Sequence, residues 1–506
     1  MDATDKSTLD AEKEISAIER WAVLLAQAHA DLKTALQRIA QLEAENAALK
    51  KQLGASVTST KLDQPYSVDA EEKRQEARGR RRQRKESKKQ RRGRIANEEK
   101  VQRAQRVEEV YPENVPHDQC RLSHVRLVWR FEQGLAVLVA YRIYRGPKKQ
   151  YGIIPGVLGR SEFGLEIVVT IAYLVYVAGL SFDKVCFLIG FFQNLHLSKS
   201  QADALLRQLS YHWREEFDIL CTLLAHSLVV HADETSWSIH SVWTFLSEKV
   251  RLLFFGVHKD GATLQAILDP ETFKGLVFSD DAAVYAHFTN AQKCWAHLLR
   301  KAIKLTLQDP KNESYRKLAD ELLDIFHEAN RLLHDQRFSA AGRQRKVDDL
   351  VKKVFALCQP LTFAEPAPGT LDYDQRLLAS EIMRLALREQ LFTFVMAEPA
   401  AQPNGQSVPL DGTNNEAERA QRPAAQARAT GRTSKTPAGA RRTSIITSVL
   451  ESLRLYLPKY TLSNVIEEIQ RWLATGRSCF RELMEKLNLD LSDDSVLDRV
   501  LPEPSG

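Results

Sequence analysis

Residues 228–280 read LVVHADETSWSIHSVWTFLSEKVRLLFFGVHKDGATLQAILDPETFKGLVFSD, and four short apolar runs stand out in this stretch. Each run is rich in Val, Leu or Phe and is bounded by polar residues, which predicts a β-strand. The four expected strands are 228–232, 242–246, 252–256 and 275–279. A helical stretch, 262–268, lies between the third and fourth runs, with Gly before it and Pro after it. The pattern therefore predicts an α/β domain.

Acidic residues follow the first and the fourth of these expected strands. Asp233 closes the first run, and Asp280 closes the fourth. Three consecutive strands, a crossover helix and a fourth strand match the order of the ribonuclease-H-like fold, in which the first and fourth strands are neighbours. A single Asp at a strand end is more often a turn former. The ordered pair instead predicts two carboxylates that meet at one edge of the sheet.

A third acid stands in TNNEAER, residues 413–419. Thr413 with Glu416 three residues later is a capping-box pattern, which predicts the start of a helix. Glu418 would then lie in the first turns of that helix, facing the strand ends. Three converging carboxylates repel one another unless cations lie between them, and oxygen ligands suit Mg²⁺ or Mn²⁺. Two such ions can promote an in-line phosphoryl displacement.

Four motifs in this order resemble the IS66 family of bacterial insertion-sequence transposases, which belong to the DDE superfamily. The motifs are HADETSW (231–237), SD (279–280) followed by Tyr285, KCWAH (293–297) and NNEAER (414–419). The resemblance covers roughly residues 150–450. It implies a DNA transposase that binds element ends and catalyses metal-dependent phosphodiester hydrolysis and strand transfer. It also implies that Asp233, Asp280 and Glu418 are the catalytic, metal-binding triad.

In the mechanism that we expect, Asp233 bridges two Mg²⁺ (or Mn²⁺) ions, Asp280 holds one ion and Glu418 holds the other. Arg419 and Arg422, one turn apart on the Glu418 helix, are candidates for binding flanking DNA phosphates. The alternative is that both arginines are solvent-exposed charges on the helix surface and bind no DNA. His297 is a candidate accessory residue that orients a phosphate or a water molecule, and a buried structural histidine is the alternative.

The positive charge of the chain is concentrated in one segment. Lys and Arg exceed Asp and Glu by 71 − 65 = +6, whereas residues 78–94 alone carry eleven basic residues and one acid. Such a run stays extended and binds nucleic acid through phosphate contacts, with a strong salt dependence. A solvated linker is the alternative. The expected DNA-contacting residues in this arm are Arg80, Arg81, Arg82, Arg84 and Lys85.

A heptad repeat precedes the basic run. Its a positions are apolar except for Asn46, which favours a parallel, in-register dimer because a buried amide pairs best with its twin. We expect a coiled coil that makes a homodimer or a higher homo-oligomer. A long amphipathic helix packed on its own chain is the alternative. The a positions are Ile18, Leu25, Leu32, Ile39, Asn46 and Leu53.

The segment before the predicted sheet mixes strands and helices. Residues 125–144 predict a hairpin that turns at Glu132-Gln133-Gly134. Within 163–214, Ser181 and Ser198 are plausible N-caps of two short helices. Two such helices fit a helix-turn-helix reader of the DNA major groove, although helical hairpins are also common in proteins that read no DNA.

These patterns divide the chain into seven regions. The core is interrupted by a helical insertion, whose linkers are expected at the Pro-rich stretches 360–368 and 399–409. The regions are a coiled coil (1–56), a basic disordered linker and DNA arm (57–108), a small β-rich segment (109–160), a helical, helix-turn-helix-like DNA-binding domain (161–222), a ribonuclease-H-like catalytic core (223–310 and 405–445), the helical insertion (311–404), and C-terminal helices with a tail (446–506).

Several classes of protein are excluded. The six cysteines include no CxxC pair, which argues against a disulfide scaffold or a CxxC-type zinc ribbon. The longest apolar run, 167–180, is too short to span a bilayer, and the charged N-terminus lacks an apolar leader. We expect a cytoplasmic, nucleoid-associated protein that acts on double-stranded DNA. Two alternatives are a nuclease of the same fold without strand transfer and a non-catalytic dimeric DNA-binding protein derived from a transposase.

Overall fold

The computed structural model describes Gln41 and residues 95–506, apart from 399, 408–409, 492–493 and 502–506. The chain divides into two compact units, 1–94 and 95–506, and two β-sheets lie in the second. Apart from Gln41, the predicted coiled coil (1–56) lies outside the described residues, as do Arg80, Arg81, Arg82, Arg84 and Lys85 of the basic arm, so both stay predictions. The predicted disordered linker (57–108) is wrong at its end, because Asn97–Arg103 forms a helix and a strand begins at Arg106.

A three-stranded sheet begins the second unit, after the short helix α3 (Asn97–Arg103). Its strands are β1 (Arg106–Val110), β2 (Arg121–Glu132) and β3 (Leu135–Arg145), in the order β1-β3-β2. The predicted hairpin is confirmed, because β2 and β3 pair antiparallel up to Glu132 and Leu135. Gln133 and Gly134 form the two-residue turn, with φ of 48° and 82°. Positive φ at both positions matches the twist of the flanking strands.

Four helices follow, with η2 (Tyr173–Val177) directly after the first of them. They are α4 (Leu165–Ala172), α5 (Phe182–Gln193), α6 (Lys199–His212) and α7 (Arg214–Ala225). Both predicted caps are confirmed: the Ser181 and Ser198 hydroxyls accept the backbone N–H groups of Lys184 and Gln201. Every residue of α4 except Thr170 is buried, as its apolar sequence requires. No helix in the described part of the chain is both long enough and apolar enough to cross a membrane.

A five-stranded sheet forms the centre of the second unit, and its strand order is β6-β5-β4-β7-β8. The four strands predicted from the apolar runs and the short helix between them, α8 (Gly261–Ile267), are confirmed. As predicted, the first and fourth are neighbours, because β4 pairs parallel with β7. One detail differs: β4 continues past Asp233 to Ser236. The strands are β4 (Val229–Ser236), β5 (Ser241–Ser247), β6 (Arg251–Val257), β7 (Leu276–Ser279) and β8 (Ala291–Lys293).

Helix α15 (Pro437–Leu453) covers the β6 edge of this sheet through a row of serines. Ser444, Ser448 and Ser452 are spaced four apart and therefore share one face of the helix. Their hydroxyls accept the N–H groups of Phe255, Leu253 and Arg251 of β6, each at 2.9 Å. The unpaired donors of an edge strand are thereby satisfied inside the protein, which prevents pairing with another chain.

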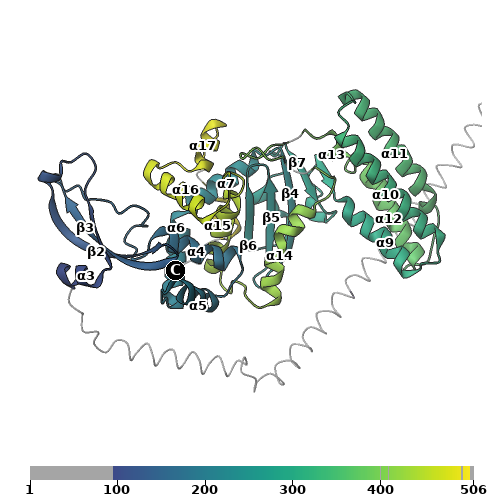
Figure 1. The fold of residues 1–506 in the computed structure, drawn as a ribbon. Helices are drawn as coiled ribbons and strands as arrows, with labels where there is room; N and C mark the ends of the chain where they lie inside the picture. The colour runs from purple at the N-terminus through teal and green to yellow at the C-terminus, as the bar shows by residue number, and fades with distance from the viewer. Residues whose placement is uncertain (1–40, 42–94, 399, 408–409, 492–493, 502–506) are drawn as a thin grey trace, which may run out of the picture. The chain divides into compact units, whose positions relative to one another are not determined.

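Five helices lie between β8 and α14 (Asn415–Ala429) in the chain, and three long ones, α10–α12, lie side by side in Figure 1. The five are α9 (Trp295–Gln308), α10 (Glu313–His334), α11 (Ala340–Thr362), α12 (Leu371–Leu387) and α13 (Thr393–Met396). They share one hydrophobic cluster with Val229, Leu276 and Phe278 of the sheet. The predicted linker start at Pro360 is wrong, because α11 runs through Pro360 to Thr362.

The C-terminal helices pack back onto the helical segment that precedes the sheet. They are α16 (Leu462–Thr475), α17 (Cys479–Lys486) and α18 (Val496–Val500). Helix α17 packs on α7, and the Ser478 hydroxyl at its start donates to the Glu216 carboxylate of α7. Helix α14 packs along β4 and β5, as Figure 1 shows, so the sheet receives a segment that is distant in sequence.

Candidate active site

Asp233 lies in the C-terminal half of β4, and its side chain is half-buried. Burial is the main cause that raises the pKa of Asp233 to about 7, and the charge of the adjacent Glu234 adds to it. The carboxylates of Asp280 and Glu418 raise this pKa further. Interactions between charges fade with distance, so Asp280 and Glu418, from two segments distant in sequence, lie near enough to Asp233 to disfavour its charge.

Asp280 directly follows β7, the parallel neighbour of β4, and several contacts hold its loop in place. Its carboxylate accepts the N–H of Ala282 at 3.0 Å, and its carbonyl accepts the ammonium of Lys293 at 3.0 Å. The next acid, Asp281, forms an ion pair with Arg384 of α12. These contacts hold the Asp280 carboxylate at the end of β7. The ion pair of Asp281 connects the same loop to α12.

The predicted capping box at the start of α14 is wrong. The helix begins after Asn414, and no side chain caps its first N–H groups. The Thr413 hydroxyl donates to Asp411 at 2.7 Å instead, and the Glu416 carboxylate pairs with Arg251 of β6 at 2.9 Å. Both residues that would form the box are engaged by other partners. The helix start and the place of Glu418 in its first turn are as predicted.

Asn414 joins three elements at the candidate site, and its side chain is buried. Its amide donates to the carbonyl of Ala232 at 2.8 Å, next to Asp233. Its amide oxygen lies 3.3 Å from His231 Nδ1, and its backbone N–H donates to the Cys294 sulfur at 3.2 Å. These contacts fix the start of α14 against β4 and the start of α9. Asn414 belongs to the NNEAER motif, but no local pattern in the sequence indicated this joining role.

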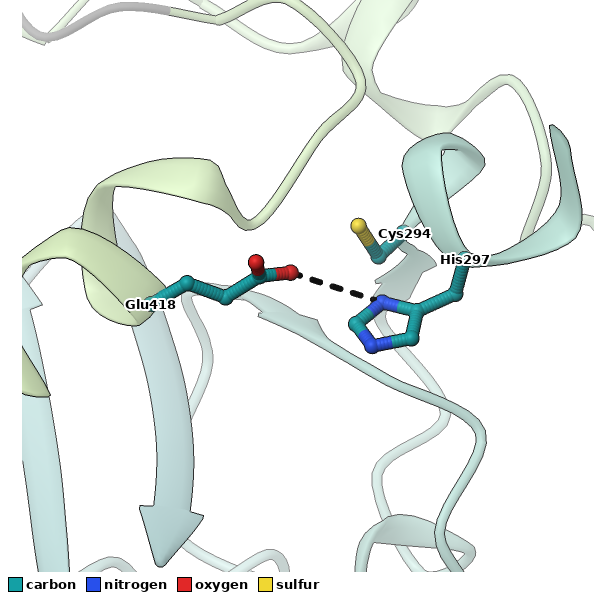
Figure 2. Close-up of side chains that lie close together, drawn as sticks. All are labelled: Cys294, His297 and Glu418. Carbon is teal, nitrogen blue, oxygen red and sulfur yellow. Dashed lines mark ion pairs between the residues drawn. The ribbon is translucent and has the colours of Figure 1, made fainter. Parts of the chain in front are cut away.

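Glu418 points toward the first turns of α9, as Figure 2 shows. Both of its oxygens accept from Arg300 at 3.0 Å, and one lies 3.7 Å from His297 Nδ1. Among the described residues, the three whose ligand atoms all lie within 4.8 Å of one another are Cys294, His297 and Glu418. The Asp280 and Glu418 carboxylates raise the pKa of Asp233, but the three predicted carboxylates form no such tight group among the described residues.

Two lysines make contacts close to the acids. Lys293 is buried and donates to the Ser279 hydroxyl at 2.9 Å, and burial lowers its pKa to about 8. Lys259 pairs with Glu234 at 2.9 Å, and the Tyr285 hydroxyl donates to the same carboxylate. Sequence reasoning missed Lys259 and Arg300, because each acts across elements whose pairing no local pattern reveals.

The predicted DNA-contacting residues of α14, Arg419 and Arg422, are both exposed. Arg419 lines a cavity of about 730 Å³ that is rich in basic side chains. The other basic residues along this cavity are Arg251, Arg432, Lys435, Arg442 and Arg454. Exposure leaves Arg419 and Arg422 accessible to a phosphate backbone, and their role in DNA binding stays a prediction. His297, by contrast, lies against Glu418.

The raised pKa of Asp233 predicts a pH-dependent stability of the metal-free protein. Folded Asp233 retains a proton that the unfolded chain releases, so stability falls as pH rises from about 4 to about 7, and the cost remains above that range. We expect Asp233→Asn to raise the free energy of unfolding by about 2 kcal/mol at pH 8, after allowing for partial solvent exposure, and by less than half as much at pH 5.

Thermal unfolding of both proteins in EDTA at the two pH values measures this difference. Glu216, whose pKa burial also raises to about 7, contributes equally to both proteins, so the comparison isolates Asp233. If the difference in the free energy of unfolding between wild type and Asp233→Asn is equal at pH 5 and pH 8, the prediction is wrong. The Asp233 carboxylate would then be ionised at both pH values, and its surroundings would not disfavour the charge.

A sequence model described as "Transposase IS66 family" matches residues 160–442, which is more than half of the chain. No curated protein matched the chain. The matched region contains Asp233, Asp280 and Glu418, together with the five-stranded sheet and the helices α9–α14. Transposases act on DNA, so transposition is the function that the match supports and DNA is the partner that it implies. The chain belongs to the IS66 family of transposases.

Proposed function

We propose that Asp233, Asp280 and Glu418 are the DDE triad of a ribonuclease-H-like core that cuts DNA at element ends and joins the cut end to target DNA. The observation that carries the proposal is the parallel pairing of β4 and β7, which puts Asp233 and Asp280 on neighbouring strands, and the contribution of Asp280 and Glu418 to the raised pKa of Asp233 agrees with it. The strand order β6-β5-β4-β7-β8, with acids on the parallel neighbours β4 and β7, supports the fold assignment.

The donor set fits two Mg²⁺ or Mn²⁺ ions. Three carboxylates supply only oxygen ligands, which hard divalent cations prefer. Burial is the main cause of the raised pKa of Asp233, and the repulsion from Glu234, Asp280 and Glu418 that adds to it would be relieved by a cation. Asp233 would hold both ions, Asp280 one and Glu418 the other. When bound, the ions supply activation of the attacking oxygen and stabilisation of the leaving oxygen.

The protein's own groups would position the DNA strand and balance its charge. In the first step the oxygen of a water molecule attacks phosphorus, the bond from phosphorus to the 3′ oxygen breaks, and that oxygen takes up a proton. In the second step the freed 3′-hydroxyl attacks a target phosphodiester and displaces the 3′ oxygen of the target strand. Each step exchanges one phosphorus–oxygen bond for another, so no energy source or covalent protein intermediate is needed.

Basic residues around the triad would bind the strand on either side of the reacting phosphate. Arg419 and Arg422 face solvent on the helix that carries Glu418. Arg300 neutralises Glu418 in the metal-free protein and would be free to bind phosphate once Glu418 binds an ion. The basic arm, residues 78–94, would add salt-dependent affinity, and the predicted coiled coil would bring two catalytic units to paired element ends.

The test is incubation of the purified full chain with Mg²⁺ and DNA that carries the ends of its own element. We expect nicking that leaves a 3′-hydroxyl at the element end, followed by a joined product with target DNA, and neither product in EDTA. Cleavage without joining would identify a nuclease of the same fold. DNA binding that is indifferent to Mg²⁺, with no cleavage at any concentration of Mg²⁺ or Mn²⁺, would refute catalysis and leave a DNA-binding protein.

A further inference from the structure

Three side chains from two elements converge beside the proposed triad. Cys294 is the N-cap residue of α9, His297 lies one turn further on, and Glu418 comes from the first turn of α14. Figure 2 shows the three side chains directed at a common space, with ligand atoms that all lie within 4.8 Å of one another. The sequence separation between Cys294 and Glu418 means that only the tertiary fold creates this group.

The Nδ1 atom of His297 supplies an independent observation that points to a ligand. It is buried and makes no hydrogen bond, although it faces the sulfur and the carboxylate. Buried polar atoms in folded proteins almost always have a partner, so an isolated one needs an explanation. Its distance of 3.7 Å to the Glu418 oxygen is too long for a hydrogen bond. It is close to the separation of about 3.4 Å between two ligand atoms on a tetrahedral zinc ion.

The surroundings of Cys294 suit a metal-bound sulfur. The side chain is 2% exposed, and its sulfur accepts the backbone N–H of Asn414 at 3.2 Å. The N–H groups at the start of α9 also face it, because Cys294 occupies the N-cap position. Burial raises the pKa of the Cys294 thiol, these N–H donors oppose that rise, and a bound metal ion would stabilise the thiolate directly.

We propose that Cys294, His297 and Glu418 bind one zinc ion, or a divalent transition ion of similar softness, at a site separate from the Asp233 and Asp280 carboxylates. Sulfur and imidazole nitrogen are ligands that Zn²⁺ accepts and Mg²⁺ avoids. Three protein ligands leave a fourth position for water. Arg300, which now contacts both Glu418 oxygens, would keep one of them while the other binds the ion.

The consequence rests on the proposed function, because Glu418 would belong to both sites. An ion held by Cys294 and His297 would keep the Glu418 carboxylate bound beside α9 and so unavailable to an ion held by the two aspartates. Zinc would therefore inhibit Mg²⁺-dependent cleavage, and DNA cutting would depend on the ratio of the two metals. This shared ligand explains why the tight group of ligand atoms among the described residues includes Glu418 but neither aspartate.

Metal binding by the full chain tests the site without any activity measurement. With Co²⁺ as the probe, we expect thiolate-to-metal charge-transfer absorption that Zn²⁺ displaces. The affinity for Zn²⁺, measured by competition with a chromophoric chelator, should fall about tenfold or more in Cys294→Ser and in His297→Ala. Cys186→Ser, which changes a half-buried cysteine on α5, is the matched control and should bind Zn²⁺ as the wild type does. Thermal unfolding confirms that each variant is folded.

Charge-transfer absorption that persists in folded Cys294→Ser, or its absence from the wild type, would overturn the proposal. Asp233→Asn separates the two sites, because it should lose cleavage and keep Zn²⁺ binding. If the wild type cleaves no DNA under any condition, the proposed function fails and the binding result still stands. If Zn²⁺ inhibits wild type and Cys294→Ser equally, the shared role of Glu418 is wrong.

Discussion

Asp233→Asn should lower the rate of Mg²⁺-dependent cleavage at an element end by about 10³-fold or more, with DNA affinity changed by less than about twofold. Asparagine keeps the shape of the side chain but removes the charge that would hold both ions. Among the described residues, the hydrogen bond that the structure gives this carboxylate is the one that it accepts from the adjacent Glu234 N–H. The loss should therefore fall on catalysis and not on folding.

Single-turnover cleavage of an end-labelled DNA, with binding measured in parallel at fixed salt, gives both quantities. Asp281→Asn is the matched control, since Asp281 lies beside Asp280 but pairs with Arg384. We expect this control to lose less than about tenfold, because it removes an acid that holds a loop and no metal ligand. Cleavage by Asp233→Asn within tenfold of the wild type would contradict the proposed triad.

Glu418→Gln should cause a loss of similar size, about 10³-fold, because in the proposed triad the third carboxylate would hold one of the two ions. Here the same helix offers a matched control. Glu416 lies two residues earlier in the first turn of α14, and its carboxylate pairs with Arg251 of β6 instead of facing α9. Glu416→Gln should keep cleavage within about tenfold of the wild type.

The same single-turnover assay, run over a range of Mg²⁺ and Mn²⁺ concentrations, separates metal binding from helix stability. If Glu418 is a metal ligand, Glu418→Gln should stay inactive or need far more metal, while the melting temperature is preserved. Equal losses in Glu416→Gln and Glu418→Gln would show that any change to the first turn of α14 is damaging. The assignment of Glu418 as a metal ligand would then lose its support.

Much of the five-stranded sheet could be predicted from the sequence because its strands are continuous apolar runs. Strands buried on both faces, such as β5 and β6, carry Val, Leu and Phe with few interruptions. The acids at 233 and 280 could be placed because polar residues end such runs. The adjacency of β4 and β7 was expected because the strand order matches the ribonuclease-H-like fold, and the structure adds that the two strands are parallel.

Contacts between distant segments could not be predicted. Strand β8 has three residues and no apolar run, and its outer edge is satisfied by residues near 390. From the sequence, the serines of α15 suggest a polar, solvent-facing helix surface. The structure shows that they contact the edge of β6. The α14 capping box failed because Arg251 and Asp411 compete for its members, and neither competitor lies at helix spacing.

The partners of Glu418 are a further example. Arg300 and His297 share a face of α9, and nothing in either sequence motif indicates that this face meets α14. The Pro360 prediction failed for a related reason. Proline disfavours a helix interior through local sterics, and packing of α11 against α10 and α12 outweighs that cost for the last turn.

Crystals of the protein grown with Mn²⁺ and DNA that carries an element end would test the proposed triad without relying on rates, because manganese is located by its anomalous scattering. We expect two manganese ions, with Asp233 bound to both, Asp280 to one and Glu418 to the other. Manganese bound to Glu418 with neither aspartate, or no ion at Asp233 while DNA lies at the strand ends, would contradict the triad.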